Sequence, residues 1–323
     1  MPADSTDAGG NVNWIFNDTR PHWLGTSGTA FDEPSNWSGG TVPGAGDSVV
    51  VASANPVVIS AATTIGALTV AAGANMTVNN TLAVNGSVVV EDGGMLVWNK
   101  RGTIGGSLVL FDGAEMTHTV NTGSTEQYKI DLVIGGDGYI AAGARINCCG
   151  KGLTDNGLGG GVLAGRDAGG SHGGRGYATH AAMPCYGSLM NPTNIGSRGT
   201  WGAYGGGAVV LNFAGDFVFD GEITVEGGAA TGYYTGSGGS IFIKCATFSG
   251  TGCLNANGST SSENSLYGGG GRIAVHTTSA TSLDAFTGTM TAWGGCTGGV
   301  TVNGSAGTIY TETAAVRPGH GTV

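Results

Sequence analysis

Short runs of alternating hydrophobic and polar residues recur at a fixed interval in the first half of the chain. Three segments, GALTVAAGANMTV, GSVVVEDGGMLVW and GSLVLFDGAEMTH, begin 20 residues apart at Gly66, Gly86 and Gly106. Alternation with period two predicts β-strands, and the Gly, Asn and Asp residues between the runs predict tight turns. The apolar residues of the three segments fall at equivalent positions: Leu68, Val88 and Leu108; Val70, Val90 and Leu110; Met76, Leu96 and Met116.

A second series of strands follows with a longer interval. The runs GGGAVVLNF, GGSIFIKC and GGGRIAVHT each begin with glycines, and the last glycines before the strands, Gly207, Gly239 and Gly271, are 32 residues apart. Matching second runs, FDGEITVEGG, GTGCLNANGS and FTGTMTAWGG, lie between them, and AGTIYTE begins a further unit at Ala306. Each unit is therefore expected to contain a strand, a turn, a second strand and a glycine-rich loop.

The chain has no convincing helical segment, which predicts an all-β fold. The 20-residue repeat then decides between the all-β folds. The repeat is too short for a propeller blade, which needs about 40 residues, and it suits one coil of a parallel β-solenoid. Coils stacked about 4.8 Å apart bury a ladder of apolar residues that one coil alone could not bury. We therefore predict an all-β fold, a single-stranded right-handed parallel β-helix. A β-sandwich is the alternative, but antiparallel strands would not require the same residue types at a constant offset.

The pattern divides the chain into four parts. Residues 1–50 contain Trp14, Trp23 and Trp37 and are predicted to form an aromatic cap over the first coil, as solenoids require. Residues 51–144 are predicted to form coils of the 20-residue repeat, and residues 207–323 coils of the 32-residue repeat. Between them, residues 145–206 lose the periodicity and are predicted to be a glycine-rich, cationic insertion.

Composition narrows the class of partner. Glycine accounts for 65 of the 323 residues, about three times its average share, while only 11% of residues are charged. The net charge of −10 argues against nucleic acid, and no stretch approaches the roughly 18 apolar residues of a membrane span. The N-terminal MPADSTDAGG lacks the apolar core of a signal peptide, and the C-terminal AAVRPGHGTV resembles a linker. We therefore expect the chain to be one segment of a longer protein.

The six cysteines are compatible with disulfide bonds in an oxidising, extracellular compartment. None lies in a Cys-X-X-Cys pair, which argues against a zinc ribbon or a thioredoxin-type site. We expect Cys245 and Cys253 to form a local pair, and Cys148 or Cys149 to reach Cys185. The alternative is that some of them are small buried residues without a disulfide partner.

Several motifs resemble those of known families. NWSGGTVPGAGDSVVV, residues 36–51, resembles the opening of bacterial surface proteins with autotransporter-type or pectate-lyase-like β-helices. GGSHGGRG, YGSL, GGSI and GGGGRIAV resemble a glycine-rich β-helix family of large secreted proteins. The resemblance implies the architecture and an extracellular location. It does not select an activity, because that superfamily includes pectate lyases, glycan hydrolases, phage tailspikes and adhesins without catalytic activity.

Positive charge is concentrated in the irregular insertion, and long irregular insertions commonly carry function. We hypothesise that this segment meets an acidic or sulfated glycan. The alternative is that its arginines tie together loop carbonyls and nearby acids. The charged residues from 145 to 198 are Arg145, Lys151, Arg166, Arg175 and Arg198, opposed by Asp155 and Asp167.

The GGSHGGRGYATH segment contains the residue types of a polysaccharide lyase. That reaction removes the proton next to a uronate carboxylate, so it needs a base, an acid and a cation on the carboxylate. His172, Tyr177 or His180 could serve as the base or acid, and Arg175 or Lys151 could hold the carboxylate. The alternative is that the histidine and arginine side chains bind backbone groups and hold a glycine turn.

Hydrolysis would instead need two carboxylates about 5 to 10 Å apart. Asp216, Asp220, Glu222 and Glu226 lie near one another in the sequence, and alternation places the last three on one strand face. The alternative is an ordinary solvated face.

Aromatic residues in or beside the glycine loops could stack on sugar rings or anchor the loops. They are Tyr186, Trp201, Tyr204, Tyr233, Tyr234 and Tyr267. GGSHGGRG is not expected to bind phosphate, because no helix follows it. No cofactor or metal site is predicted, although calcium is kept open at the turn carboxylates of DAGG and GGDG. The predicted substrate-binding set is Lys151, Arg166, Tyr186, Arg198, Trp201 and Tyr204.

Three functions remain. The first is a secreted or cell-surface β-helix module with an adhesive or structural role, whose partner is a polysaccharide or glycoconjugate. The second is a polysaccharide lyase or glycoside hydrolase acting on an anionic polysaccharide. The third is an extracellular subunit that assembles with copies of itself or with neighbouring domains.

Overall fold

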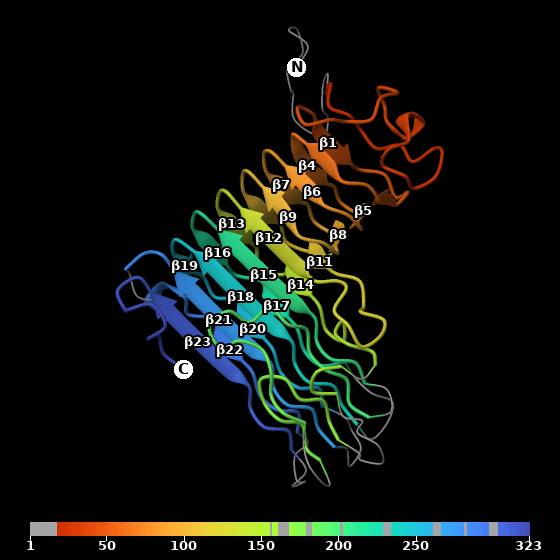
Figure 1. Cartoon of the computed structure of the whole chain (residues 1–323). Coiled ribbons are helices and arrows are strands. Elements are labelled where there is room, and N and C mark those ends of the chain that lie inside the picture. The colour runs from red at the N-terminus through yellow and green to blue at the C-terminus, as the bar shows by residue number, and fades with distance from the viewer. Residues whose placement is uncertain are drawn as a thin grey trace.

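The protein is almost entirely β-structure in the computed structural model, shown in Figure 1. The structure describes residues 18–155, 157–160, 168–178, 183–200, 203–228, 234–260, 266–280, 283–296 and 303–323. Within these ranges the only helices are two short 3-10 turns, η1 (Pro34–Asn36) and η2 (Leu283–Ala285).

The strands form three sheets, and from β1 to β21 the chain visits them in a fixed cyclic order. The first sheet contains β1 (Ser48–Val51), β4 (Ala67–Val70), β7 (Val88–Val90), β10 (Leu108–Leu110), β13 (Gly138–Ile140), β16 (Phe217–Phe219) and β19 (Phe248–Ser249). The second contains β2 (Val57–Ile59), β5 (Asn75–Val78), β8 (Met95–Trp98), β11 (Glu115–Thr117), β14 (Arg145–Asn147), β17 (Glu222–Thr224), β20 (Cys253–Asn255) and β22 (Thr289–Thr291). The third contains β3 (Thr63–Ile65), β6 (Leu82–Val84), β9 (Gly102–Ile104), β12 (Ile130–Ile134), β15 (Ala208–Phe213), β18 (Ser240–Cys245), β21 (Arg272–Thr277) and β23 (Thr308–Thr313).

Parallel pairing between successive coils confirms the registers predicted from the repeats. Leu68 pairs with Val88, which pairs with Leu108, and the 32-residue series aligns β15, β18 and β21 in the same way. All pairs between the strands named above are parallel, which rules out the β-sandwich for this part of the chain. The architecture is compatible with a β-solenoid.

The core is the space enclosed by the three sheets. Alternate residues of β4, β5 and β8 are buried, because side chains on a strand point to opposite faces. Burying one such Leu, Ile or Phe side chain contributes about 1.5–3 kcal/mol. In the later coils aromatic rings replace aliphatic residues, and Phe248 stacks on Phe286 with ring centroids 4.5 Å apart.

The segment before β1 covers the edge of the first coil. Trp23 N donates to Val50 O at 2.9 Å, and Phe31 N donates to Val58 O at 3.1 Å. The Trp37 ring packs edge-on against Trp23 and Phe31, with centroids 5.1 and 4.9 Å apart. The two backbone hydrogen bonds satisfy groups that would otherwise be open at the end of the stack. Trp14 lies outside the described residues.

The stack of strands continues past Arg145, the position at which the insertion was predicted to begin. Residues 145–147 form β14, which pairs with both β11 and β17. The 20-residue interval is lost earlier, because a long loop separates β11 from β12. Because of that loop, β12 begins later in the sequence than the 20-residue interval predicts, but it still pairs with β9 and β15.

Beyond the sheets, glycine-rich segments form a second structure that we call the outgrowth. It comprises the described parts of residues 148–207, 225–239, 256–271 and 292–307. In each later coil an outward leg continues the second sheet, and a return leg leads into the third sheet. Figure 1 shows these legs running together, away from the edge that carries the labels β4, β7 and β13.

Backbone hydrogen bonds hold the legs of the outgrowth together in more than one direction. Gly227 N donates to Asn257 O in the next outward leg at 3.0 Å, and Gly239 N donates across to Val225 O at 2.8 Å. A Cβ on Gly236 would overlap the carbonyl oxygen of Tyr204. The glycine content therefore permits backbone to pack directly on backbone.

Candidate functional site

A row of outward-facing side chains extends the second sheet into the outgrowth. Asn147, Thr224, Asn255 and Thr291 are in register at the ends of their strands. The parallel hydrogen bonding continues beyond them, since Gly150 N donates to Glu226 O and Gly258 N donates to Trp293 O. The next outward positions are therefore also in register, with neighbours about 4.8 Å apart. We call these residues the outer row: Cys149, Glu226, Asn257 and Trp293.

Asparagine amides fix the outer row. Asn255 Nδ2 donates to Glu226 Oε1 at 2.7 Å, and Trp293 N donates to Asn257 Oδ1 at 2.7 Å. Trp293 is nevertheless 65% exposed, which is unusual for so large an apolar ring. The row thus combines an available aromatic face with a carboxylate and an amide that are already held in place.

Two cavities lie along this row and meet at Cys149. One, of about 350 Å³, is lined by Glu226, Asn257, Ser259, Thr260, Trp293, Cys296 and intervening glycines. The other, of about 430 Å³, is lined by Met95, Val97, Glu115, Thr117, His118, Thr119, Val120, Asn147 and Lys151. Together they form what we call the groove, which crosses six strands of the second sheet and extends roughly 24 Å at 4.8 Å per step.

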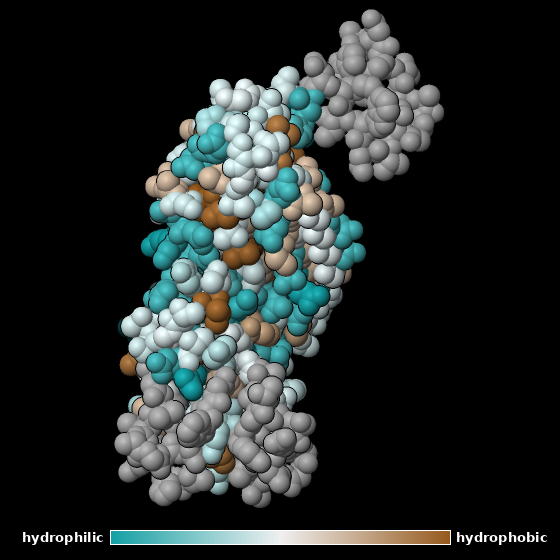
Figure 2. Space-filling model, turned by 90° about the vertical axis from the view of Figure 1, so that its right-hand side faces the viewer, coloured by the Kyte–Doolittle hydropathy of each residue, from teal (hydrophilic) through white to brown (hydrophobic). Residues whose placement is uncertain are grey.

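The groove is suited to hydroxyl groups rather than to a strongly charged ligand. Its polar groups are mainly amides and hydroxyls, and its charged residues are Glu115, Lys151 and Glu226. Figure 2 shows the side of the molecule that lies to the right in Figure 1, where hydrophobic and polar residues are mixed along the stack. The groove lining contains both kinds of residue, with Asn147 and Asn257 as well as Val97 and Trp293.

Comparison with known proteins does not assign a ligand to the groove. No family model, curated protein or solved structure matches this chain. Among the described residues, no three or more His, Cys, Asp or Glu side chains are grouped to hold a metal ion. The same described residues contain no helix with the length and apolar character needed to cross a membrane.

The four predicted carboxylates are not gathered at one site. Glu222 and Asp220 line a separate cavity of about 390 Å³ with Arg145, whereas Glu226 lies in the groove. Asp216 and Asp220 accept hydrogen bonds from Thr247 and Thr251 in neighbouring turns. Four residues of strand place the Cα atoms of Glu222 and Glu226 about 13 Å apart.

The residues proposed for a lyase lie in a hairpin of the outgrowth. His172 is fully buried, and its Nδ1 lies 2.9 Å from Gly238 O, with the ring against Tyr186. Burial lowers the pKa of His172 to about 4. Arg175 is exposed and Tyr177 half-buried, and their backbones bind Ser305 and Tyr267. His180 lies outside the described residues. The described contacts of His172 are those of a residue that holds the glycine backbone.

The predicted substrate-binding residues are also dispersed. Lys151 lines the groove, and Tyr204 is exposed outside it. Arg198 ties the loop together, because its Nη1 donates to Thr154 O at 2.8 Å and lies 3.6 Å from Asp155. Tyr186 OH donates to Ile195 O, and burial raises the pKa of this phenol above its usual value. Arg166 and Trp201 lie outside the described residues.

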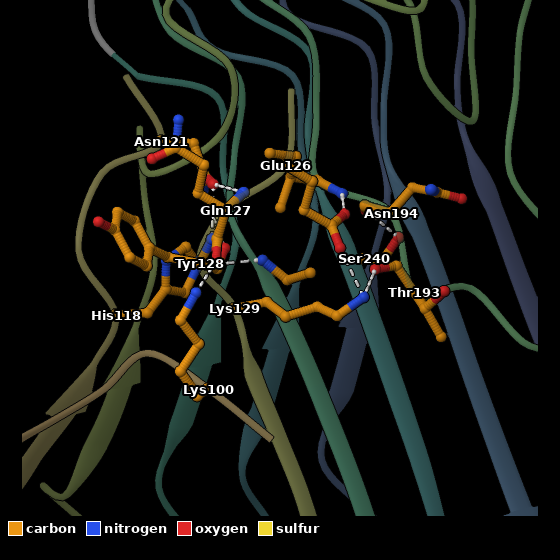
Figure 3. Close-up of polar contacts among 12 residues, drawn as sticks. Lys100, His118, Asn121, Glu126, Gln127, Tyr128, Lys129, Thr193, Asn194 and Ser240 are labelled. Carbon is orange, nitrogen blue, oxygen red and sulfur yellow. Dashed lines mark hydrogen bonds and ion pairs between the residues drawn. The ribbon is translucent and has the colours of Figure 1, made fainter. Parts of the chain in front are cut away.

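A polar cluster that includes Lys129 and Glu126 holds the segment of Thr193 and Asn194 on the third sheet (Figure 3). Lys129 Nζ lies 2.6 Å from Glu126 Oε1 and donates to Thr193 O at 3.2 Å. Ile195 N donates to the other oxygen of Glu126, and Ser240 Oγ donates to Asn194 O at 2.6 Å. These contacts fix a separate cavity of about 300 Å³ behind Tyr186, away from the groove.

All six cysteines are free in the structure, so neither predicted disulfide is formed. Cys245 ends a strand of the third sheet, whereas Cys253 begins a strand of the second. Cys148 is buried and Cys185 is exposed. Burial raises the pKa of Cys148 and of Cys245 to about 12, so both remain protonated thiols at neutral pH.

Sequence reasoning missed Asn257 and Trp293. Both follow the second strand of a 32-residue unit, in ANGS and AWGG. The equivalent position in the preceding unit is Glu226, in VEGG. Aligning the ends of these runs, as well as their beginnings, would have placed the three side chains in one row.

Proposed function

We propose that this chain is a secreted or cell-surface module that binds a glycan chain along the groove without cleaving it. The scaffold we infer is a right-handed parallel β-helix, because crossovers between parallel strands are right-handed in about 98% of cases. The extracellular location follows from the resemblance to glycine-rich secreted β-helices. The adhesive or structural role follows from a rigid, repetitive scaffold with one elongated binding face.

The observation that carries the proposal is the outer row beside the groove. An exposed indole can stack on the apolar face of a sugar ring, while carboxylate and amide groups exchange hydrogen bonds with its hydroxyls. Asn255 holds the Glu226 carboxylate, and the backbone N–H of Trp293 holds the Asn257 amide oxygen, so binding would cost little side-chain entropy. Repetition of polar groups along the stack suits an extended ligand that contacts several coils.

The arrangement of titratable groups supports binding rather than cleavage. A lyase needs a base with access to the substrate, and His172 has no exposed surface. A hydrolase of the usual type needs paired carboxylates across its substrate, and the cavity beside the outer row contains one acid, Glu226. Asp220 and Glu222 share a different cavity, where Arg145 lies with them. The single Lys151 in the groove favours a neutral glycan over a polyanionic one.

Replacing Trp293 with Ala should weaken glycan binding about tenfold, because a stacked aromatic ring contributes about 1.4 kcal/mol of binding free energy. The measurement is calorimetric titration with a panel of neutral and uronate-containing oligosaccharides. Phe111→Ala is the matched control, since Phe111 is also exposed but belongs to a turn beside the first sheet.

Equal affinities of Trp293→Ala and the parent chain would contradict the proposed site. The same panel should be assayed for unsaturated products and new reducing ends, and we expect neither. Product formation that disappears in His172→Ala or Tyr177→Phe would instead establish the lyase.

A further inference from the structure

The outer face of the first sheet carries a narrow apolar stripe. Each short strand presents one outward side chain, and pairing between coils aligns these in a single column. Tyr139 and Val218 are 39% and 38% exposed, and Phe111 in the adjoining turn is 47% exposed. The residues of the column, which we call the stripe, are Thr69, Val89, Val109, Tyr139 and Val218.

Carboxylates border the stripe on both sides. Before the strands, Asp137 and Asp216 occupy neighbouring positions of one column, and after the strands Asp92 and Asp112 do the same. The first-sheet strands with their flanking turns comprise residues 45–53, 66–74, 86–94, 105–114, 135–144, 214–221 and 246–252. These segments contain seven acidic residues and no Lys, Arg or His: Asp47, Glu91, Asp92, Asp112, Asp137, Asp216 and Asp220.

No Lys or Arg falls within these segments, although Arg145 directly follows one of them and lines a cavity with Asp220. Lys151 lies in the groove, Lys244 on the third sheet and Arg198 in the outgrowth. Arg20 of the cap lies near Glu91, but its guanidinium binds Asp18 at 2.8 Å. The first-sheet face is therefore a strongly acidic surface with an apolar centre, a combination that marks an interaction site.

We propose that the stripe and its acidic borders dock a basic amphipathic helix of a partner polypeptide. The helix would lie along the stack with its apolar side on the stripe, and its Lys and Arg side chains would extend to both borders. The distance between the two borders matches the width of a helix. Four residues of strand from Asp216 to Asp220 span about 13 Å, and a helix is 10–12 Å wide.

A partner other than a second copy fits this surface best. The described residues of this chain contain no α-helix, so a copy could not supply one from that part. The borders also repel an identical acidic face. Because the groove follows the second sheet and the stripe follows the first, this inference stands independently of glycan binding.

The test uses the whole chain and a fluorescent 18-residue Leu/Lys peptide that forms an amphipathic helix, with anisotropy as the readout. The triple variant Asp112→Asn, Asp137→Asn, Asp216→Asn should bind about tenfold more weakly, from three exposed charge contacts. Asparagine keeps the side-chain oxygens that accept from Asp216 N and Thr247 Oγ1. The control triple Asp32→Asn, Asp131→Asn, Glu222→Gln has the same net charge and should bind like the parent.

Tyr139→Ser should weaken the same peptide severalfold, whereas Trp293→Ala in the groove should leave it unchanged. A peptide with Glu in place of Lys should not bind. Equal losses in the two triple variants would show a general charge effect and overturn the proposal. It would also be overturned by full affinity in Tyr139→Ser, or by no binding of the basic peptide.

Discussion

Replacing Gly239 with Ala should lower the free energy of unfolding by about 3 kcal/mol, because overpacking a tight interior costs roughly this amount. A Cβ at Gly239 would overlap the carbonyl oxygen of Gly207 in the neighbouring return leg. The obstacle is backbone rather than a flexible side chain, so it cannot move aside cheaply. The added methyl would separate legs that Gly239 N joins to Val225 O.

The measurement is urea unfolding followed by circular dichroism, with hydrogen exchange to locate the loss. Gly46→Ala is the matched control, since a Cβ there meets no atom within 4 Å. That change should leave stability within about 0.5 kcal/mol of the parent. Similar stabilities for the two variants would show that the outgrowth does not pack as described.

Acid should destabilise the fold through His118. The ring is fully buried at the base of the outgrowth, where Nδ1 binds Thr119 O at 2.8 Å and Nε2 accepts from Ala208 N at 3.2 Å. Burial lowers the pKa of His118 from 6.5 to about 4. Protonation would place a hydrogen on Nε2 facing the Ala208 N–H, so the two donors would oppose each other.

A lowered histidine pKa means that the unfolded chain binds the proton more tightly than the folded chain. The contribution is fully present above pH 6.5 and is lost as pH falls toward 4, by about 3 kcal/mol for this residue. His172, with a pKa also lowered to about 4, should add a similar loss. Stability measured from pH 7 to 4 checks this, and His118→Gln should flatten the profile. A flat profile for the parent chain would contradict the buried, neutral histidines.

The stacked sheets were predictable because side-chain pattern and strand geometry agree. Leu68, Val88 and Leu108 recur at one interval, and only a parallel stack places them in contact. The outgrowth was not predictable in this way. Glycine has no side chain, so a run such as GGSHGGRG contains no alternation from which direction could be inferred.

The candidate site was missed for a related physical reason. A glycine-rich segment with histidine and arginine is compatible both with reactive groups and with side chains that hold the backbone, and only the fold shows that His172 is directed at Gly238 O. Trp293 is separated from Glu226 by one intervening coil, so the two positions are about 10 Å apart in space although they are 67 residues apart in sequence. Their proximity depends on register between loops of unequal length.

Hydrogen exchange with and without a bound oligosaccharide tests the account most directly. If a glycan lies along the groove, added protection should concentrate in residues 225–228, 256–260 and 292–296, which line or adjoin the outer row. The hairpin at residues 168–178 should exchange as it does without ligand. Protection centred on that hairpin, with none along the outer row, would contradict the proposed binding face.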